Sequence, residues 1–103
     1  MKLVRDEIPR IITDSGRVCT WRRVSTRDEH MDGLRAKILE EADEFIENPC
    51  EEEAADMLEV LFAFTHLNGI DFEDVLEVAR EKAEERGGFY NGIILQEILN
   101  ENR

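Results

Sequence analysis

Apolar residues recur at intervals of three and four along residues 26–46, which predicts an amphipathic helix. Thr26 with Glu29 three positions later is the pattern of a capping box, so the helix is expected to begin just after Thr26. Its apolar face comprises Met31, Leu34, Ile38, Leu39, Ala42, Phe45 and Ile46. A face of this width predicts that the helix packs against another element.

A second helix is expected from about Pro49 to Leu67, where Asn68-Gly69 is a common C-terminal signal. Residues 54–64 are apolar nearly all round, which is typical of a helix at the centre of a bundle. In the joint before it, Asn48 is the predicted N-cap, Pro49 the first helical residue and Glu51 the third. So short a joint predicts an antiparallel hairpin with axes about 8–10 Å apart.

Shorter elements flank the predicted hairpin. Asp6 is the expected cap of a short helix that ends at Gly16, and residues 18–24 alternate weakly, which favours an extended segment. Asp71 is the expected cap of a third long helix, whose buried side would be Phe72, Val75, Leu76, Val78 and Ala79. Residues 93–99 are predicted to form a short amphipathic helix. The fold class is therefore all-α.

Two pairs of acids, each pair three residues apart, lie on the two hairpin helices. Glu41 and Glu44 share one face of the first helix, and Glu53 and Asp56 share one face of the second. Across a hairpin, these carboxylates can converge on one hard cation such as Mg²⁺, which removes their mutual repulsion. The alternative is that they are solvated charges in an acid-rich chain. Burial of the second helix favours the metal site, because acids at the edge of a buried helix need a counter-charge.

Composition limits the kinds of partner that the protein is expected to bind. The 103 residues predict a single domain, residues 1–103, and the formal net charge of −12 disfavours nucleic acid polymers and anionic membranes. The longest apolar run is far below the ~18 residues of a membrane span. Cys19 and Cys50 do not make a disulfide framework, and the charged N-terminus does not resemble a signal peptide, so a cytoplasmic location is expected.

The residues carry a resemblance. Lys37-x-x-Glu40-Glu41-x-x-Glu44 followed by Glu53-x-Ala55-Asp56 resembles the ExxE, spacer, ExxD signature of the MazG-like all-α nucleotide pyrophosphohydrolases. The segments 2–12 (KLVRDEIPRII) and 82–89 (KAEERGGF) are similar to the opening and the end of the branch labelled phosphoribosyl-ATP pyrophosphohydrolase-like. The four blocks span nearly the whole chain in the family's order.

The resemblance implies a reaction and a set of roles. Nucleoside triphosphates would be cleaved between the α and β phosphates with Mg²⁺, or Mn²⁺ in its place, for example to cleanse the nucleotide pool. The metal ligands would be Glu41, Glu44, Glu53 and Asp56; the catalytic acids would be Glu40, Glu41 and Glu44; the substrate phosphates would meet Lys2, Arg5, Lys37, Lys82 and Arg86. Glu59 is a further candidate ligand or base.

Two alternatives stay open. Phosphoribosyl-ATP pyrophosphohydrolase itself shares the acidic core, although the N-terminal block resembles the other branch. The other alternative belongs to a different functional class: a helical bundle without catalysis that serves as an assembly partner. In each case a homo-oligomer, dimer or tetramer, is expected, because a hairpin and one further helix complete a four-helix bundle only by association.

Overall fold

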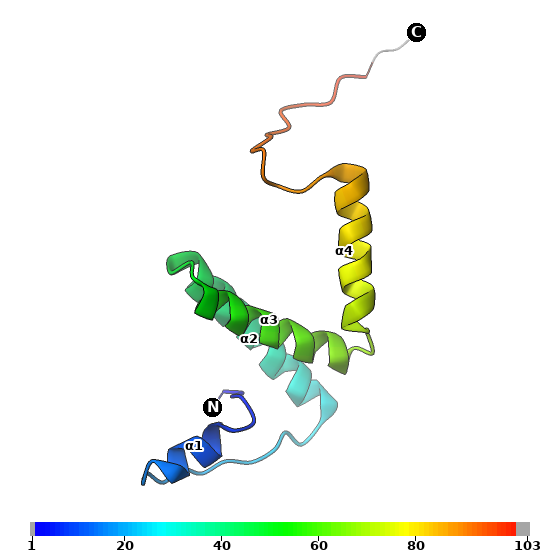
Figure 1. Cartoon of the computed structure of the whole chain (residues 1–103). Coiled ribbons are helices and arrows are strands. Elements are labelled where there is room, and N and C mark those ends of the chain that lie inside the picture. The colour runs from blue at the N-terminus through cyan, green and yellow to red at the C-terminus, as the bar shows by residue number, and fades with distance from the viewer. Residues whose placement is uncertain (1, 101–103) are drawn as a thin grey trace. The chain divides into compact units, whose positions relative to one another are not determined.

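In the computed structural model, which describes residues 2–100, all regular secondary structure is helical. These helices are α1 (Ile8–Asp14), α2 (Arg27–Glu47), α3 (Glu51–Leu67) and α4 (Phe72–Arg86), and no strand occurs in this range (Figure 1). The predicted all-α class is confirmed. None of these helices combines the length and the apolar character needed to cross a membrane.

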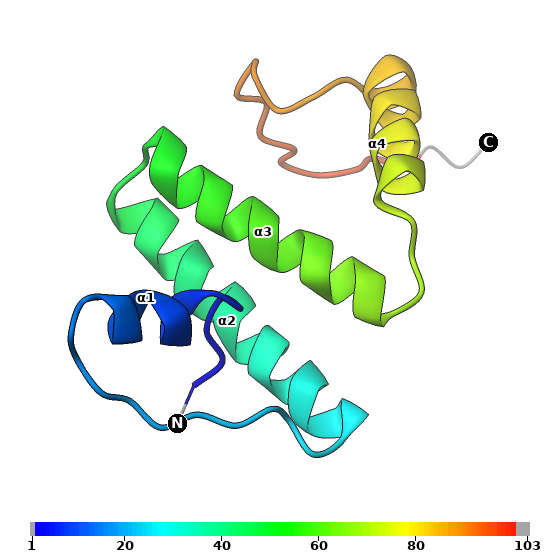
Figure 2. The same cartoon turned by 60° about the horizontal axis from the view of Figure 1, so that its bottom comes forward.

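The chain divides into two compact units, Met1–Phe72 and Glu73–Arg103, which we describe separately. In the N-terminal unit, α2 and α3 lie side by side and run in opposite directions (Figures 1 and 2). The predicted antiparallel hairpin is therefore confirmed. Met31 and Leu34 of α2 are buried apolar side chains, and Glu41 is nearly as deeply buried.

The start of α2 follows the predicted cap. The Thr26 hydroxyl accepts the Glu29 N–H at 3.1 Å, and the Glu29 carboxylate accepts the Ser25 N–H at 2.7 Å. Arg22 donates to both carboxylate oxygens of Glu29, at 2.9 and 2.7 Å. The hydrogen bond from Arg22, followed by that from Ser25, lowers the pKa of Glu29 to about 2. The segment before α2 is thus tied to its first turn.

The joint between α2 and α3 differs from the prediction. Asn48 ends α2, with its N–H donating to the Glu44 carbonyl at 2.9 Å, instead of capping α3. The α3 helix begins at Glu51 after Cys50, which is extended and makes no side-chain cap. A residue before proline is disfavoured in the helical region, which explains why α2 stops at Asn48. Acidic residues in the first turn of α3 complement the helix dipole instead.

The end of α3 confirms the sequence signal. Gly69 has a φ of 70°, and its N–H donates to the His66 carbonyl at 3.0 Å. The Ile70 N–H donates to the Thr65 carbonyl at 2.9 Å. These are the two bonds of a Schellman motif, in which glycine takes the left-handed conformation at little cost.

Two shorter elements correct the sequence reading. The α1 helix begins at Ile8 after Glu7, not after Asp6, and has no side-chain cap; Pro9 in its first turn needs no N–H partner. Residues 18–24 are neither helix nor strand. No strand lies within residues 2–100 to pair with them, and an isolated strand is unstable.

In the C-terminal unit, two predictions of burial and helicity are wrong. Residues 93–99 have no regular secondary structure, because Gly92, with a φ of 64°, precedes a segment too short to be a stable helix alone. On α4, Leu76 and Val78 of the predicted buried side are exposed by 57% and 49%. Asp71 directly precedes α4, as predicted.

Candidate metal centre between two helices

Three acids from two helices meet in the N-terminal unit. One carboxylate oxygen each from Glu41 of α2 and Glu53 and Asp56 of α3 lies within 4.8 Å of the other two. Glu41 is only 7% exposed, whereas Glu53 and Asp56 are half-buried. Pairing of α2 with α3 therefore brings together three of the four predicted metal ligands.

Two oxygen atoms of this group lack hydrogen-bond partners. Glu41 Oε2 and Glu53 Oε2 are both buried and unpaired. Burying an unpaired carboxylate oxygen is costly, so such an atom needs a partner that the protein alone does not supply. All the donors are carboxylates, and oxygen ligands of this kind are preferred by Mg²⁺ and Mn²⁺. The residues present therefore fit a hard divalent cation.

A second group of acids shares one member with the first. Oxygens of Glu40, Glu41 and Glu44 also lie within 4.8 Å of one another. The negative charge of Glu41, followed by burial, raises the pKa of Glu44. Glu44, the fourth predicted ligand, thus belongs to the neighbouring group along α2, and Glu41 connects the two groups.

Lysine side chains partly neutralise the acids on α2. Lys37 Nζ lies 3.3 Å from Glu41 Oε1 and 3.4 Å from Glu40 Oε1, and its side chain is only 17% exposed. Lys2 Nζ lies 3.4 Å from the same Glu40 oxygen. The charge of Lys37, more than that of Lys2, lowers the pKa of Glu40. Two of the residues predicted to bind phosphate therefore lie at the acid cluster, as we call the two groups of acids together.

Arg5 approaches the cluster from the N-terminal segment. Its guanidinium Nη2 donates to Asp56 Oδ1 at 2.7 Å. Leu3 lies against Gly33 of α2, so closely that a Cβ at position 33 would be 3.3 Å from the Leu3 Cβ. The missing side chain at Gly33 lets residues 2–5 lie close to α2. Lys2 and Arg5 are positioned by this approach.

A cavity of about 630 Å³ opens beside these residues. Its polar lining includes Lys2, Arg5, Lys37, Glu41, Asp56 and Glu59. This volume lies within the usual range of small-molecule sites. His30, read from sequence as a surface residue, is half-buried and also lines it. The signal was its spacing: positions 30, 34, 37 and 41 fall on one helical face.

Three of the predicted residues, Lys82, Arg86 and Glu59, lie outside the two groups of acids. Lys82 and Arg86 lie on α4 in the C-terminal unit, and their role in phosphate binding stays a prediction. Glu59 lies on α3, exposed and lining the cavity, so the structure leaves its role as ligand or base untested.

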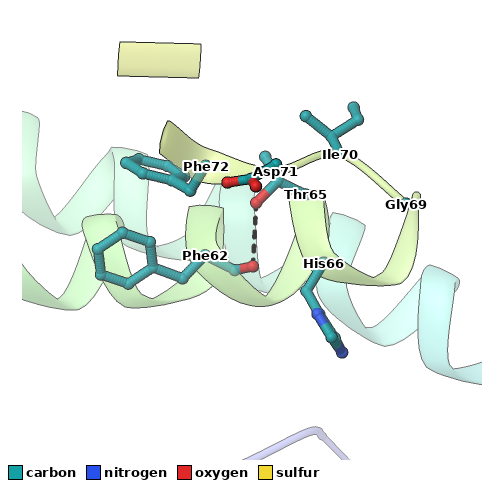
Figure 3. A pocket seen from close by; sticks show the side chains of 7 residues that line it. All are labelled: Phe62, Thr65, His66, Gly69, Ile70, Asp71 and Phe72. Carbon is teal, nitrogen blue, oxygen red and sulfur yellow. Dashed lines mark hydrogen bonds between the residues drawn. The ribbon is translucent and has the colours of Figure 1, made fainter. Parts of the chain in front are cut away.

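A shallower pocket of about 480 Å³ lies at the end of α3 (Figure 3). The rings of Phe62 and Phe72 meet edge to face there, with centroids 4.4 Å apart. The Thr65 hydroxyl donates to the Phe62 carbonyl at 3.0 Å, and His66 points away from the two rings (Figure 3). Backbone carbonyls accept the hydroxyl, so the Thr65 side chain offers this pocket no free donor.

Comparison of the chain with protein-family models, curated proteins and solved structures finds no match.

Proposed function

We propose that the protein is a metal-dependent nucleoside triphosphate pyrophosphohydrolase, which releases a nucleoside monophosphate and pyrophosphate. The observation that carries this proposal is the pair of buried, unpartnered oxygens on Glu41 and Glu53, beside Asp56. A bundle that needed these acids only for solubility would expose them to water. The sequence resemblance to MazG-like enzymes supports the same reaction.

Glu41, Glu53 and Asp56 would hold the cation, and Glu44, the fourth predicted ligand, lies beside them in the group of Glu40, Glu41 and Glu44. When bound, Mg²⁺ screens the phosphate charge and makes a coordinated water more acidic. The protein supplies the arrangement, because α2 and α3 each present two acids three residues apart and the hairpin brings the two helices together. The cavity beside the acids gives a small substrate access to them.

Cations at the cavity would bind and orient the polyphosphate. Lys2, Arg5 and Lys37 line the cavity and lie within ion-pair distance of the acids. Each can donate to phosphate oxygens, and Arg5 can do so with two parallel bonds. By resemblance, Lys82 and Arg86 would add further contacts to the leaving pyrophosphate. These groups would hold the α phosphorus in line with an attacking water.

A carboxylate that is not fully used in metal coordination or ion pairing would accept the proton of that water. Lys2 and Lys37 hold the carboxylate of Glu40, whereas Glu44 is exposed and faces other acids. We therefore favour Glu44 as the proton acceptor, with Glu40 as the alternative.

The proposal is tested by a panel of canonical and damaged NTPs and dNTPs, together with phosphoribosyl-ATP, with Mg²⁺ or Mn²⁺, in which pyrophosphate and orthophosphate release are measured separately. Pyrophosphate release is expected. Turnover of phosphoribosyl-ATP alone would assign the chain to the competing enzyme class. Orthophosphate as the first product would contradict cleavage between the α and β phosphates.

Paired variants locate the activity. Glu41→Gln and Asp56→Asn are each expected to reduce turnover by roughly 10²-fold or more, while helicity by circular dichroism is unchanged. The matched controls are Glu47→Gln on α2 and Glu52→Gln on α3, both of which alter exposed carboxylates on the same helices. Activity close to the parent in the first two variants would remove those residues from the site, and a chain that binds the metal but turns over no nucleotide would be a bundle without catalysis.

A further inference from the structure

Arg5 forms an ion pair with a carboxylate that the proposed metal site needs. Its guanidinium lies 2.7 Å from Asp56 Oδ1, and Asp56 belongs to the same three-acid group as Glu41 and Glu53. The group also contains the buried, unpartnered Glu41 oxygen, with Glu41 only 7% exposed. A divalent cation bound at these acids would lie close to a positive side chain already paired with one of them.

We propose that Arg5 exchanges partners: it neutralises Asp56 in the metal-free protein and transfers to a substrate phosphate when a divalent cation takes the acid group. This inference rests on the proposed function and adds an order of binding to it. Arg5 is then a positioning and phosphate-binding residue whose availability depends on the metal.

Charge balance explains the exchange. In the metal-free protein, Arg5 and Lys37 each pair with one member of the three-acid group. A doubly charged ion repels the guanidinium at short distance and takes over its role at Asp56. The half-exposed Arg5 side chain lines the cavity of about 630 Å³, so it can turn toward a ligand there without a change of fold. A polyphosphate in that cavity would offer it acceptor oxygens.

The exchange predicts opposite changes in two affinities. Without Arg5, a divalent cation no longer competes for Asp56, so its binding should become tighter. Pyrophosphate loses a contact and should bind the metal-loaded protein more weakly. A guanidinium that merely orients Asp56 through a hydrogen bond predicts the reverse for the metal, because loss of such support weakens metal sites.

The test uses the full chain, Mn²⁺ followed by electron paramagnetic resonance, and pyrophosphate binding followed by calorimetry at saturating Mn²⁺. For Arg5→Gln we expect the Mn²⁺ dissociation constant to fall about two- to five-fold, the size typical of a released half-exposed ion pair. The pyrophosphate dissociation constant should rise by about ten-fold or more, as for loss of a charged hydrogen bond. Arg5→Lys, which keeps the charge, should return both constants toward those of the parent.

The matched control is Arg10→Gln. Arg10 is also an exposed arginine near the N-terminus, but it pairs with Glu7 and Asp14, which lie outside the acid cluster. It changes the net charge equally, so any general attraction of cations cancels. If either constant of Arg5→Gln matches that of Arg10→Gln, the exchange is overturned while the metal site stands. If the parent itself binds no Mn²⁺, the metal site and the exchange are both overturned.

Discussion

In the N-terminal unit, Met31 and Leu34 are buried where α2 pairs with α3, and the same pairing encloses Glu41. In the C-terminal unit, Ile94 and Leu95 are exposed by 82% and 75%, although residues 93–99 are richer in aliphatic side chains than α2 is. The difference teaches that an apolar pattern identifies residues suited to burial, whereas a site forms only where a second element covers them.

The largest expected effect concerns what covers the C-terminal apolar residues. If a second copy of the chain covers them, the parent should exceed monomer mass in light scattering at micromolar concentration. The double variant Ile94→Ser, Ile98→Ser loses two buried aliphatic side chains, worth about 1.5–3 kcal/mol each, so its dissociation constant should rise about 10²–10⁴-fold.

The matched control for this experiment is Val18→Ser, because Val18 is 94% exposed but belongs to the N-terminal unit. Its mass in solution should equal that of the parent. A monomeric parent, or a double variant with unchanged association, would show that these C-terminal residues do not form an intersubunit contact.

A smaller effect probes the buried acid of the N-terminal unit. Glu41→Met removes a buried carboxylate with one unpartnered oxygen, Oε2, while Lys37, which pairs with the other oxygen, keeps Glu40 as a partner. We expect the free energy of unfolding of the metal-free protein to rise by about 1–3 kcal/mol. Each kcal/mol corresponds to roughly 4–8 °C in Tm for a domain of this size. The same variant should lose the rise in Tm that Mn²⁺ gives the parent.

Calorimetry in the presence of a chelator, and then of Mn²⁺, measures both effects. Glu47→Met is the control, because Glu47 is exposed near the end of the same helix and its change should alter stability by less than about 0.5 kcal/mol. A less stable Glu41→Met protein in chelator would mean that the carboxylate is satisfied without a metal.

The smallest effect concerns the first turn of α2. The folded pKa of Glu29, about 2, lies below the ordinary value of 4.5. Its stabilising contribution is therefore complete above pH about 4.5 and is lost as the pH falls toward 2. Glu29→Gln removes it, so the difference in urea midpoint between parent and variant should shrink over this window.

Thr26→Ala separates this titration from capping itself. It removes the hydroxyl that accepts the Glu29 N–H and should cost about 1 kcal/mol at every pH, because a hydroxyl does not titrate there. A pH-independent difference for Glu29→Gln would indicate that its ion pair with Arg22 does not form in solution.

Helical periodicity predicted α2 and α3, the short joint predicted their antiparallel pairing, and Asn68-Gly69 predicted the end of α3. Capping preference failed at Asn48, because the choice between ending one helix and starting the next depends on the conformation before Pro49. Periodicity failed for residues 93–99, since it marks a face but supplies no tertiary contact to hold a short helix.

The acid spacing predicted that Glu41, Glu53 and Asp56 would converge. It did not predict that Arg5 would pair with Asp56, which lies 51 positions away. Nor did it predict the depth of Glu41 relative to Glu44, because both acids lie at the border of the apolar face and only the position of α3 distinguishes them. The long-range ion pair between Arg5 and Asp56 depends on the path of the N-terminal segment, which no local pattern specifies.

The gap at Gly33 has a consequence for engineering. An alanine there would improve the intrinsic helix propensity of α2 by about 1 kcal/mol. Its methyl group would lie 3.3 Å from the Leu3 Cβ, so the Leu3 side chain, in the segment that carries Lys2 and Arg5, would have to give way by a few tenths of an ångström. A gain in helix propensity at position 33 would thus act directly against the contact that positions the residues proposed to bind the ligand.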